Sequence, residues 1–269
     1  MYKLLGIDID GTIINYEQPN ITKRVKEAIF RAKKQGVHVV LISGRNYYSM
    51  KRFLEELDVK DFGITINGGI VIDLKSGEKI FETYLDEEIA RGLTNIFIQE
   101  KVAYAVFAGL NAYAVREFEK NPTVEYLKNE KDNVIVYDDT EDFLSTIKTN
   151  KFIAMTDDKN LEKLTQIIKE KYGDKVYVEY GFSGLIEIYP IGMNKGVALQ
   201  SLANKLQIPM KKVMTIGDAE NDISMLKVAG MGVAMGNAIM NVKDHADFVT
   251  KAIHEDGVAH AIDKFIFNI

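Results

Sequence analysis

Short apolar segments alternate with longer amphipathic segments along much of the chain. Four apolar runs, at 4–9, 37–42, 62–66 and 213–216, have the length of strands, and glycine-containing polar sequence follows each of them closely. Apolar residues recur three or four positions apart in the segments that follow these runs, as they do on the buried face of a helix. Strands that alternate with helices predict an α/β fold with a mostly parallel sheet.

Two helices and a hairpin complete the pattern of the first 84 residues. Apolar residues at helical spacing predict one helix within 20–36 and another over 50–57. The apolar runs 70–73 and 79–84 flank a Lys-Ser-Gly-Glu sequence at 75–78. Because this sequence is typical of a turn, the two runs are predicted to form a β-hairpin.

The middle of the chain has a self-contained set of elements. A helix is predicted to begin near Asp86, where Glu87 and Glu88 suit its first turn. Further strands are predicted at 102–107, 113–116, 134–137, 152–156, 176–180 and 185–189, with a second helix around Leu161 and Leu164. Four or more strands with helices can bury a core of their own. We therefore predict an inserted domain at 85–189 between the two parts of a core domain, 1–84 and 190–269.

Composition narrows the class of protein. The 269 residues carry 34 basic and 39 acidic side chains, a net charge of −5, without a long basic run, so neither a nucleic acid nor a membrane is expected as a partner. The chain has no cysteine, which excludes disulfides, thiolate nucleophiles and cysteine-based zinc sites. No apolar run has the pattern of a signal peptide or the length of a membrane span. We expect a cytoplasmic protein, as a monomer or a small homo-oligomer.

Asp8 and Asp10 interrupt the C-terminal end of the first apolar run, in the sequence Asp-Ile-Asp-Gly-Thr. Side chains two positions apart on a strand share a face, so both carboxylates are expected to point the same way. Two neighbouring acids at the end of a buried strand repel each other unless a cation or a shared proton lies between them. That end of a parallel sheet is also where ligands bind in open α/β folds. The pair therefore indicates a functional site.

Three more polar motifs lie at similar positions. Ser43-Gly44-Arg45 follows the second run, where a hydroxyl, a glycine amide and a helix N-terminus can bind phosphate. Lys195 begins a predicted helix, a position at which the helix dipole does not favour a cation, and this indicates another partner. The sequence Gly-Asp-Ala-Glu-Asn-Asp at 217–222 follows the last run, and Asp218 is suited to bind a hard cation.

The ordered set of motifs resembles the haloacid dehalogenase superfamily, specifically its phosphatase branch of the Cof type. The acid pair, Ser43, Lys195 and the 217–222 sequence match its four motifs, although Ser43 stands where this branch more often has threonine. The sequences 232–238 and 256–259 resemble the C-terminal signature of the branch. The resemblance implies a Rossmann-like, doubly wound core with an α/β cap inserted at 85–189 that chooses the substrate and hinges relative to the core.

The resemblance also implies a role for each motif residue. Asp8 is implied as the nucleophile and Asp10 as the general acid and base. Mg²⁺ is implied at Asp8, Asp218 and the backbone carbonyl of Asp10. The implied phosphate ligands are Ser43, the amides of Gly44 and Ile9, Lys195 and Asn221. Arg45 and Asp222 are implied as supporting residues, Arg45 through phosphate or an ion pair and Asp222 through the loop or Lys195. An Asn67-Gly68 pair also recurs near such sites, although turn chemistry alone explains it.

These inferences predict a magnesium-dependent phosphatase that hydrolyses small phosphorylated metabolites, sugar phosphates above all, through an aspartyl-phosphate. Two alternatives use the same phosphorylated aspartate. One is a phosphomutase, which transfers the phosphoryl group to a second sugar hydroxyl. The other is a non-enzymatic phospho-acceptor or phosphosugar-sensing regulator, although such a protein needs neither a cap nor Asp10.

Overall fold

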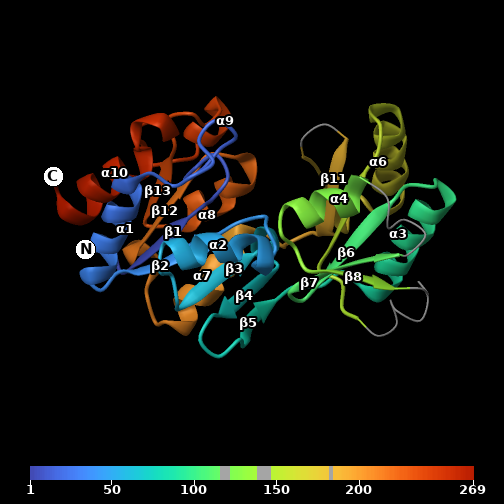
Figure 1. Cartoon of the computed structure of the whole chain (residues 1–269), viewed down its shortest axis with the longest axis horizontal. Coiled ribbons are helices and arrows are strands. Elements are labelled where there is room, and N and C mark those ends of the chain that lie inside the picture. Colours follow the sequence, from blue (N-terminus) through green and yellow to red (C-terminus); the bar gives the residue numbers. More distant parts are fainter. Residues whose placement is uncertain (116–121, 138–146, 182–183) are drawn as a thin grey trace. The chain divides into compact units, whose positions relative to one another are not determined.

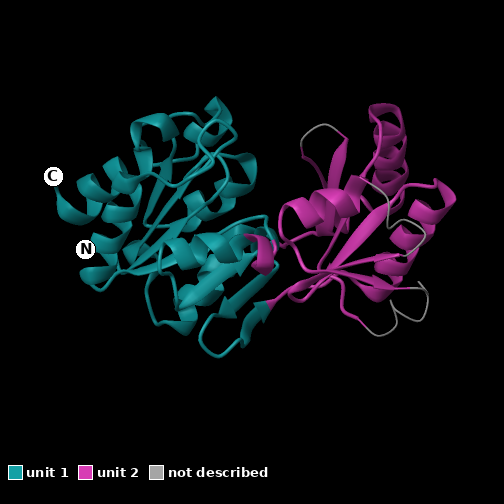
Figure 2. Cartoon of the chain, viewed as in Figure 1, with its two compact units in different colours: residues 1–45, 50–81, 194–269 teal, residues 46–49, 82–193 magenta. Residues whose placement is uncertain are grey.

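The computed structural model describes residues 1–115, 122–137, 147–181 and 184–269. The chain divides into two compact units (Figures 1 and 2). Unit 1 contains residues 1–45, 50–81 and 194–269, and unit 2 contains residues 46–49 and 82–193. The main part of unit 2, 82–193, begins and ends a few residues from the limits predicted for the inserted domain, 85–189. Unit 2 also includes the short segment 46–49, which was not predicted from the sequence to belong to it. Among the described residues, no helix combines the length and the apolar character that crossing a membrane requires.

Unit 1 is built on an eight-stranded sheet. Its strands are, in spatial order, β14 (Phe248–Val249), β13 (Met231–Ala234), β12 (Val213–Gly217), β1 (Leu4–Ile7), β2 (His38–Ile42), β3 (Phe62–Thr65), β4 (Ile70–Asp73) and β5 (Lys79–Glu82). All neighbours from β14 to β3 are parallel, β4 pairs antiparallel with β3, and β5 lies next to β4 at the edge of the sheet.

The order of the strands creates a switch point beside β1. The chain proceeds from β1 to β2 and β3 in one direction, and later from β12 to β13 and β14 in the other. The predicted doubly wound, mostly parallel α/β core is therefore confirmed. Because β12, β1, β2 and β3 are parallel, the loops at their carboxyl ends meet at one edge of the sheet, which is where such folds bind ligands.

Helices cover this sheet and bury both of its faces. They are α1 (Lys23–Lys34), α2 (Tyr47–Glu56), α7 (Lys195–Lys205), α8 (Ile223–Val228), α9 (Met240–Lys243) and α10 (Gly257–Ile262). On one face, Leu199 and Leu202 of α7 and Met225 of α8 pack in one cluster with Leu4 of β1 and Val40 of β2. The fully buried side chains of β1 agree with the continuous apolar run that predicted a central parallel strand.

Unit 2 has a separate six-stranded sheet and its own core. The strands are, in spatial order, β10 (Val176–Tyr180), β11 (Leu185–Pro190), β9 (Lys151–Met155), β6 (Tyr104–Ala108), β7 (Asn111–Val115) and β8 (Val134–Tyr137). Only the β7–β8 pair is parallel among them. The last residue of the strand predicted at 113–116 lies outside the described residues.

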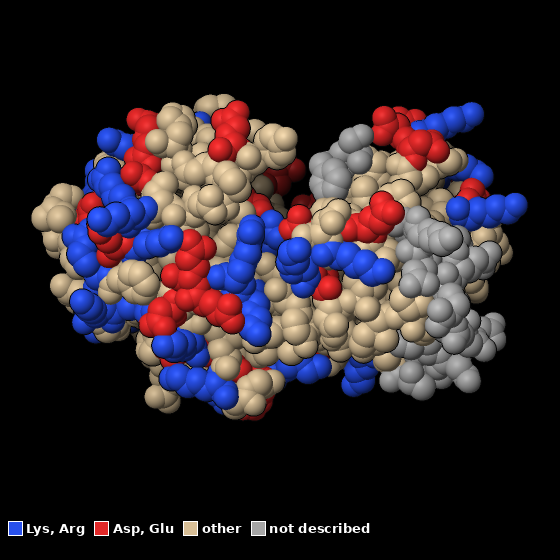
Figure 3. All heavy atoms as spheres, viewed as in Figure 1, with Lys and Arg blue, Asp and Glu red and all other residues tan. Residues whose placement is uncertain are grey.

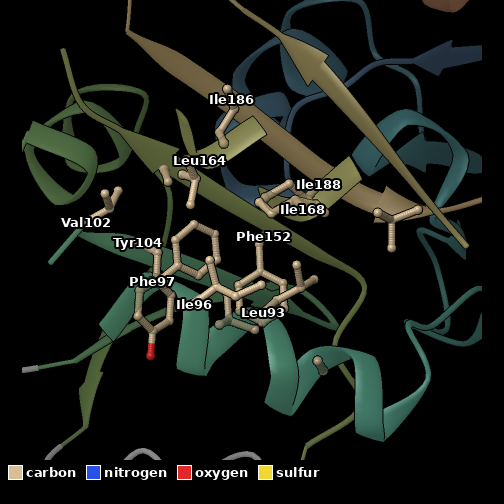
Figure 4. Close-up of a cluster of buried hydrophobic side chains, with 14 of the residues drawn as sticks. Leu93, Ile96, Phe97, Val102, Tyr104, Phe152, Leu164, Ile168, Ile186 and Ile188 are labelled. Atoms are coloured by element: carbon tan, nitrogen blue, oxygen red, sulfur yellow. The ribbon is translucent and has the colours of Figure 1, made fainter. Parts of the chain in front are cut away.

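The core of unit 2 lies between this sheet and two helices, α3 (Glu87–Gln99) and α6 (Asp158–Tyr172), while α4 spans Pro122–Asn129. Figure 4 shows the aromatic centre of this core, in which Phe97 of α3 stacks on Tyr104 of β6 with ring centroids 4.8 Å apart. Phe152 of β9 completes the group, with its centroid 5.6 Å from that of Phe97. Unit 2 therefore buries enough apolar surface to form a core without that of unit 1.

Candidate active site

A tight turn follows β1 and contains the Asp-Gly-Thr sequence. The carbonyl of Ile9 accepts hydrogen bonds from the amides of Thr12, Ile13 and Ile14. Gly11 has φ +85°, and a Cβ at this position would lie 2.1 Å from Oδ2 of Asp218. Only glycine tolerates both this backbone conformation and this approach. The turn therefore places the acids that follow β1 directly against the loop that follows β12.

Asp8, Lys195 and Asp222 form a buried cluster of charges, here called the ion triad. Nζ of Lys195 lies 2.7 Å from Oδ1 of Asp8 and 2.5 Å from Oδ1 of Asp222. The exposed fractions are 4%, 1% and 0% for Asp8, Lys195 and Asp222. Lys195 is the first residue of α7, whose N-cap Asn194 accepts a hydrogen bond from the amide of Val197. The helix dipole does not favour a cation at the start of a helix, and the carboxylates of Asp8 and Asp222 offset this disadvantage for Lys195.

Charges elsewhere on the protein are mostly in contact with water. Lys and Arg side chains are interspersed with Asp and Glu side chains over the face drawn in Figure 3. In one surface pair of unit 1, Nζ of Lys26 lies 2.6 Å from Oε1 of Glu56, and the side chains are 33% and 34% exposed. Such pairs contribute ~0–1 kcal/mol because water already solvates both partners. The ion triad differs because none of its members retains much contact with solvent.

The electrostatics of the triad favour a positive charge at its centre. Burial lowers the pKa of Lys195, but Asp222 and Asp8 outweigh this effect, and the pKa lies above its usual value. Burial raises the pKa of Asp8 well above its usual value, Asp222 raises it further, and Lys195 opposes the rise only in part. The site therefore holds more negative charge than the lysine alone compensates, and it favours a further cation.

Asp222 organises the loop between β12 and α8, which includes the short 3₁₀ turn Glu220–Asp222. Its Oδ2 accepts hydrogen bonds from the amides of Asp218 at 2.8 Å and Ala219 at 3.0 Å, while its Oδ1 accepts from Lys195. A Cβ at Gly217 would lie 2.5 Å from Cγ of Asp222, so glycine permits this packing. Both oxygens of Asp222 are thus used to hold the loop and the lysine.

Asp218 lies beside the triad. Its Oδ1 accepts a hydrogen bond from Oγ1 of Thr12 at 2.7 Å. Burial raises the pKa of Asp218 to about 6, Thr12 lowers it, and the charge of Asp222 raises it again. Oxygen atoms of Asp8, Asp218 and Asp222 all lie within 4.8 Å of one another.

This donor set fits a hard divalent cation. Its members are carboxylates, which magnesium prefers, and the excess of negative charge would be offset by binding it. Asp222 is already occupied by the lysine and two amides, so Asp8 and Asp218 are the carboxylates with capacity for a metal. The carboxylate of Asp10 is not a member of the cluster, and the predicted contact of its backbone carbonyl with the metal stays a prediction.

Asp8 and Asp10 differ in partner and in exposure, because Asp8 is buried against Lys195 whereas Asp10 is half exposed. The expected common direction of the two carboxylates stays a prediction. β1 ends at Ile7, but the amide of Asp8 still donates to the carbonyl of Ile216 in β12, so Asp8 continues the strand pairing while Asp10 belongs to the turn. The side chain of Asp10 is 51% exposed and forms two hydrogen bonds with Arg45, from Nε and Nη2, each of 2.8 Å. Arg45 is therefore an ion-pair partner of Asp10, and its contact with phosphate stays a prediction.

Ser43 and Gly44 follow β2, next to β1 in the sheet. Ser43 is 1% exposed, and its amide donates to the carbonyl of Ile64 at 3.0 Å. Its Oγ accepts a hydrogen bond from the amide of Arg45 at 3.2 Å, so the hydroxyl hydrogen can donate to another acceptor. A Cβ at Gly44 would lie 2.8 Å from Oδ1 of Asn67, so its backbone approaches that side chain closely.

Two asparagines that were not predicted as site residues hold the loops together. Nδ2 of Asn221 donates to Oδ1 of Asn67 at 3.1 Å, which joins the loop after β12 to the turn after β3. Nδ2 of Asn237 donates to the carbonyl of Gly11 at 2.8 Å, and its Oδ1 accepts from the amide of Ile253. The only signals in the sequence were the Asn67-Gly68 turn and the position of Asn237 within the C-terminal signature. Neither signal reveals a contact across the fold.

Comparisons with known proteins identify the family to which the chain is similar. The sequence pattern of the haloacid dehalogenase-like hydrolases matches residues 5–262. The 5-amino-6-(5-phospho-D-ribitylamino)uracil phosphatase YcsE of Bacillus subtilis is 33% identical, with 98% of this chain and 96% of that protein aligned. A second phosphatase of that name and organism, YwtE, is 29% identical, with 98% of each chain aligned.

Solved structures are similar over the same extent. A haloacid dehalogenase-like hydrolase from Bacteroides thetaiotaomicron is 31% identical, with a TM-score of 0.86 over 98% of this chain and 99% of that one. The pattern match, the named phosphatases and this structure all span nearly the whole chain. The chain therefore belongs to the haloacid dehalogenase-like hydrolase family, and it is a phosphatase of the Cof type.

Proposed function

We propose that the protein is a Mg²⁺-dependent phosphatase that hydrolyses small phosphorylated metabolites, foremost sugar phosphates, with Asp8 as the nucleophile. The observation that carries the proposal is the ion triad, in which a buried carboxylate at the end of β1 is held by Lys195 beside a second acid, Asp218. Lys195 occupies Oδ1 of Asp8, and we assign Oδ2 as the attacking oxygen.

The reaction proceeds in two displacements at phosphorus. Oδ2 of Asp8 forms a bond to phosphorus while the bond to the ester oxygen breaks, and Asp10 gives its proton to the departing alcohol. Asp10 then removes a proton from a water molecule that attacks the aspartyl-phosphate. The bond between phosphorus and Asp8 breaks, orthophosphate leaves, and both acids return to their starting protonation states.

The remaining site residues bind the phosphoryl oxygens. Ser43 donates its hydroxyl hydrogen, and the amides of Gly44 and Ile9 add two neutral donors. Lys195 contributes a positive charge that reduces the repulsion between Asp8 and the phosphate. The NH₂ group of Asn221 has two hydrogens. One is donated to Asn67, and the second is available to the phosphate.

Mg²⁺ would be held by Asp8, Asp218 and the backbone carbonyl of Asp10, as the carboxylate donor set supports. When bound, it supplies a positive charge that stabilises the negative charge of the transferring phosphoryl group. Asp222 keeps Asp218 in place through the Asp218 amide and does not serve as a ligand itself.

Unit 2 is proposed to be the cap that selects the substrate. The B. subtilis relatives YcsE and YwtE are named for a phosphate ester on a ribityl chain. That substrate is a phosphorylated polyol, which supports phosphorylated sugars and sugar alcohols as the substrate class of this chain.

The test is release of orthophosphate from a panel of sugar phosphates, the ribityl phosphate ester of the relatives and one aryl phosphate, with Mg²⁺. Wild-type turnover that chelator and Asp8→Asn each abolish is the expected result. Asp244→Asn is the matched control, because Asp244 is an exposed acid of the same unit outside the site. Absence of turnover on every ester by folded wild-type protein, or full turnover by Asp8→Asn, would contradict the proposal. Transfer of phosphate to a sugar hydroxyl would instead identify a phosphomutase.

A further inference from the structure

Three successive residues after β3 have a left-handed backbone. The φ angles are +55° at Ile66, +53° at Asn67 and +92° at Gly68. Glycine and asparagine tolerate this region, but a β-branched residue such as isoleucine is rarely found there and is strained. Two backbone hydrogen bonds hold the segment, from the amide of Ile66 to the carbonyl of Arg45 and from the amide of Asn67 to the carbonyl of Ser43. The strained turn is thus attached to the loop proposed to bind phosphate.

The side chain of Asn67 lies between two of the proposed phosphate-binding loops. It is 3% exposed, and its Oδ1 accepts a hydrogen bond from Nδ2 of Asn221 at 3.1 Å. The same oxygen lies so close to Gly44 that a Cβ there would be 2.8 Å away. On the next residue, a Cβ at Gly68 would lie 2.3 Å from the carbonyl oxygen of Asn194, directly before Lys195. The turn therefore borders the loops that carry Ser43, Lys195 and Asn221.

The contact with Asn67 determines which way the amide of Asn221 faces. A carboxamide oxygen can only accept, so Asn221 has to direct its NH₂ group toward Oδ1 of Asn67. Its own Oδ1 is buried and has no hydrogen-bond partner within the described structure. A buried unpaired acceptor is unfavourable, and such atoms are most often found where a ligand or water completes the site. The amide of Asn221 is thus held in one orientation, with its remaining hydrogen and its oxygen ready for a ligand.

We propose that Asn67 is a positioning residue for phosphate binding: it orients the amide of Asn221, and the strained turn exists to place it. This inference rests on the proposed phosphatase function. It assigns a purpose to an Asn-Gly turn that local turn chemistry alone would otherwise explain. Asn67 itself does not take part in either displacement, and its effect reaches the substrate through Asn221.

The test compares Asn67→Gly, Asn221→Ala and the double variant. Glycine at position 67 removes the side chain and keeps the left-handed backbone without strain. We expect Asn67→Gly to lower kcat/KM for the best ester by about tenfold, and to weaken competitive inhibition by orthophosphate by a similar factor. Because both residues act through one hydrogen bond, the double variant is expected to lose no more than Asn221→Ala alone.

Gln207→Gly is the matched control, since Gln207 also has a left-handed backbone, at φ +56°, and is exposed beyond the end of α7. A purely structural role would lower the melting temperature of Asn67→Gly and leave orthophosphate inhibition of the folded enzyme unchanged. That result would overturn the inference, and so would losses that multiply in the double variant. Failure of the wild type to hydrolyse any ester would instead overturn the proposed function, so the two failures are distinguishable.

Discussion

Replacement of Lys195 by methionine tests the energetics of the ion triad. Methionine nearly matches the length of the lysine stem but removes the charge that lies 2.7 Å from Asp8 and 2.5 Å from Asp222. At an effective dielectric constant of about 20, each of these contacts corresponds to an attraction of ~6 kcal/mol before desolvation is subtracted. Measured losses on removal of one partner from a buried ion pair are ~3–5 kcal/mol.

We therefore expect Lys195→Met to lose ~3–5 kcal/mol of unfolding free energy in the metal-free protein, because two buried carboxylates lose their counter-charge. This corresponds to a decrease in melting temperature of roughly 10 °C. The pKa of Asp8 is already raised, mainly by burial, and removal of the lysine raises it further. Protonation of Asp8 then relieves the repulsion, so the loss is largest at alkaline pH and shrinks as the pH falls through the folded-state pKa.

The assay is urea unfolding followed by circular dichroism, in chelator, at several pH values. Lys205→Met is the matched control because it makes the same substitution at an exposed position at the other end of α7. The reasoning would be refuted if the two variants were equally stable, or if the loss in Lys195→Met did not shrink toward acidic pH.

Three further predictions concern the loops of the site. Gly11→Ala is expected to lower turnover at least about 100-fold, because its Cβ would clash with Asp218. Gly77→Ala is the control and is expected to retain activity, because it strains the backbone at φ +74° but has no neighbour within 4 Å. Arg45→Met is expected to lower kcat more than it changes KM, because it frees the proposed general acid from its ion pair. The control is Arg91→Met, which removes two hydrogen bonds to Oε1 of Glu87 away from the site, and equal kinetics in both variants would contradict this. Burial is the main cause that raises the pKa of Asp218 to about 6, so its ionisation destabilises the metal-free fold increasingly between about pH 4 and about pH 6. Asp218→Asn is therefore expected to stabilise the metal-free protein by ~3 kcal/mol above that range and not below it, and to abolish the rise in melting temperature on addition of Mg²⁺. Urea unfolding and melting curves measure both effects, and an unchanged response to Mg²⁺ would exclude Asp218 as a ligand.

The sequence predicted the fold better than the geometry within the site. Apolar runs followed closely by glycine-containing turns are local signals, so the mostly parallel, doubly wound sheet could be predicted. The pairing of Asp10 with Arg45 could not be predicted, because alternation along one strand does not specify contacts between the loops that follow two different strands.

Contacts between segments that are distant in the sequence could not be predicted either. Asn67 and Asn221 are 154 positions apart, and Asn237 and Gly11 are 226 apart, so no local pattern relates them. Lys195 could be recognised from the sequence because a cation at a helix start is unfavourable for the helix dipole, and this indicates a partner elsewhere. A polar residue in an ordinary turn, such as Asn67, gives no comparable signal in the sequence that it contacts a distant segment.

The most direct test of the central claim is to identify the phosphorylated residue. In Asp10→Asn, an aryl phosphate is the substrate of choice because its phenolate leaves with little need for a proton, while hydrolysis of the intermediate still lacks its base. Acid quenching followed by peptide mass spectrometry is predicted to find phosphate on the peptide that contains Asp8, and to find none in the Asp8→Asn variant. Phosphate on another residue, or wild-type turnover by Asp8→Asn, would contradict the account.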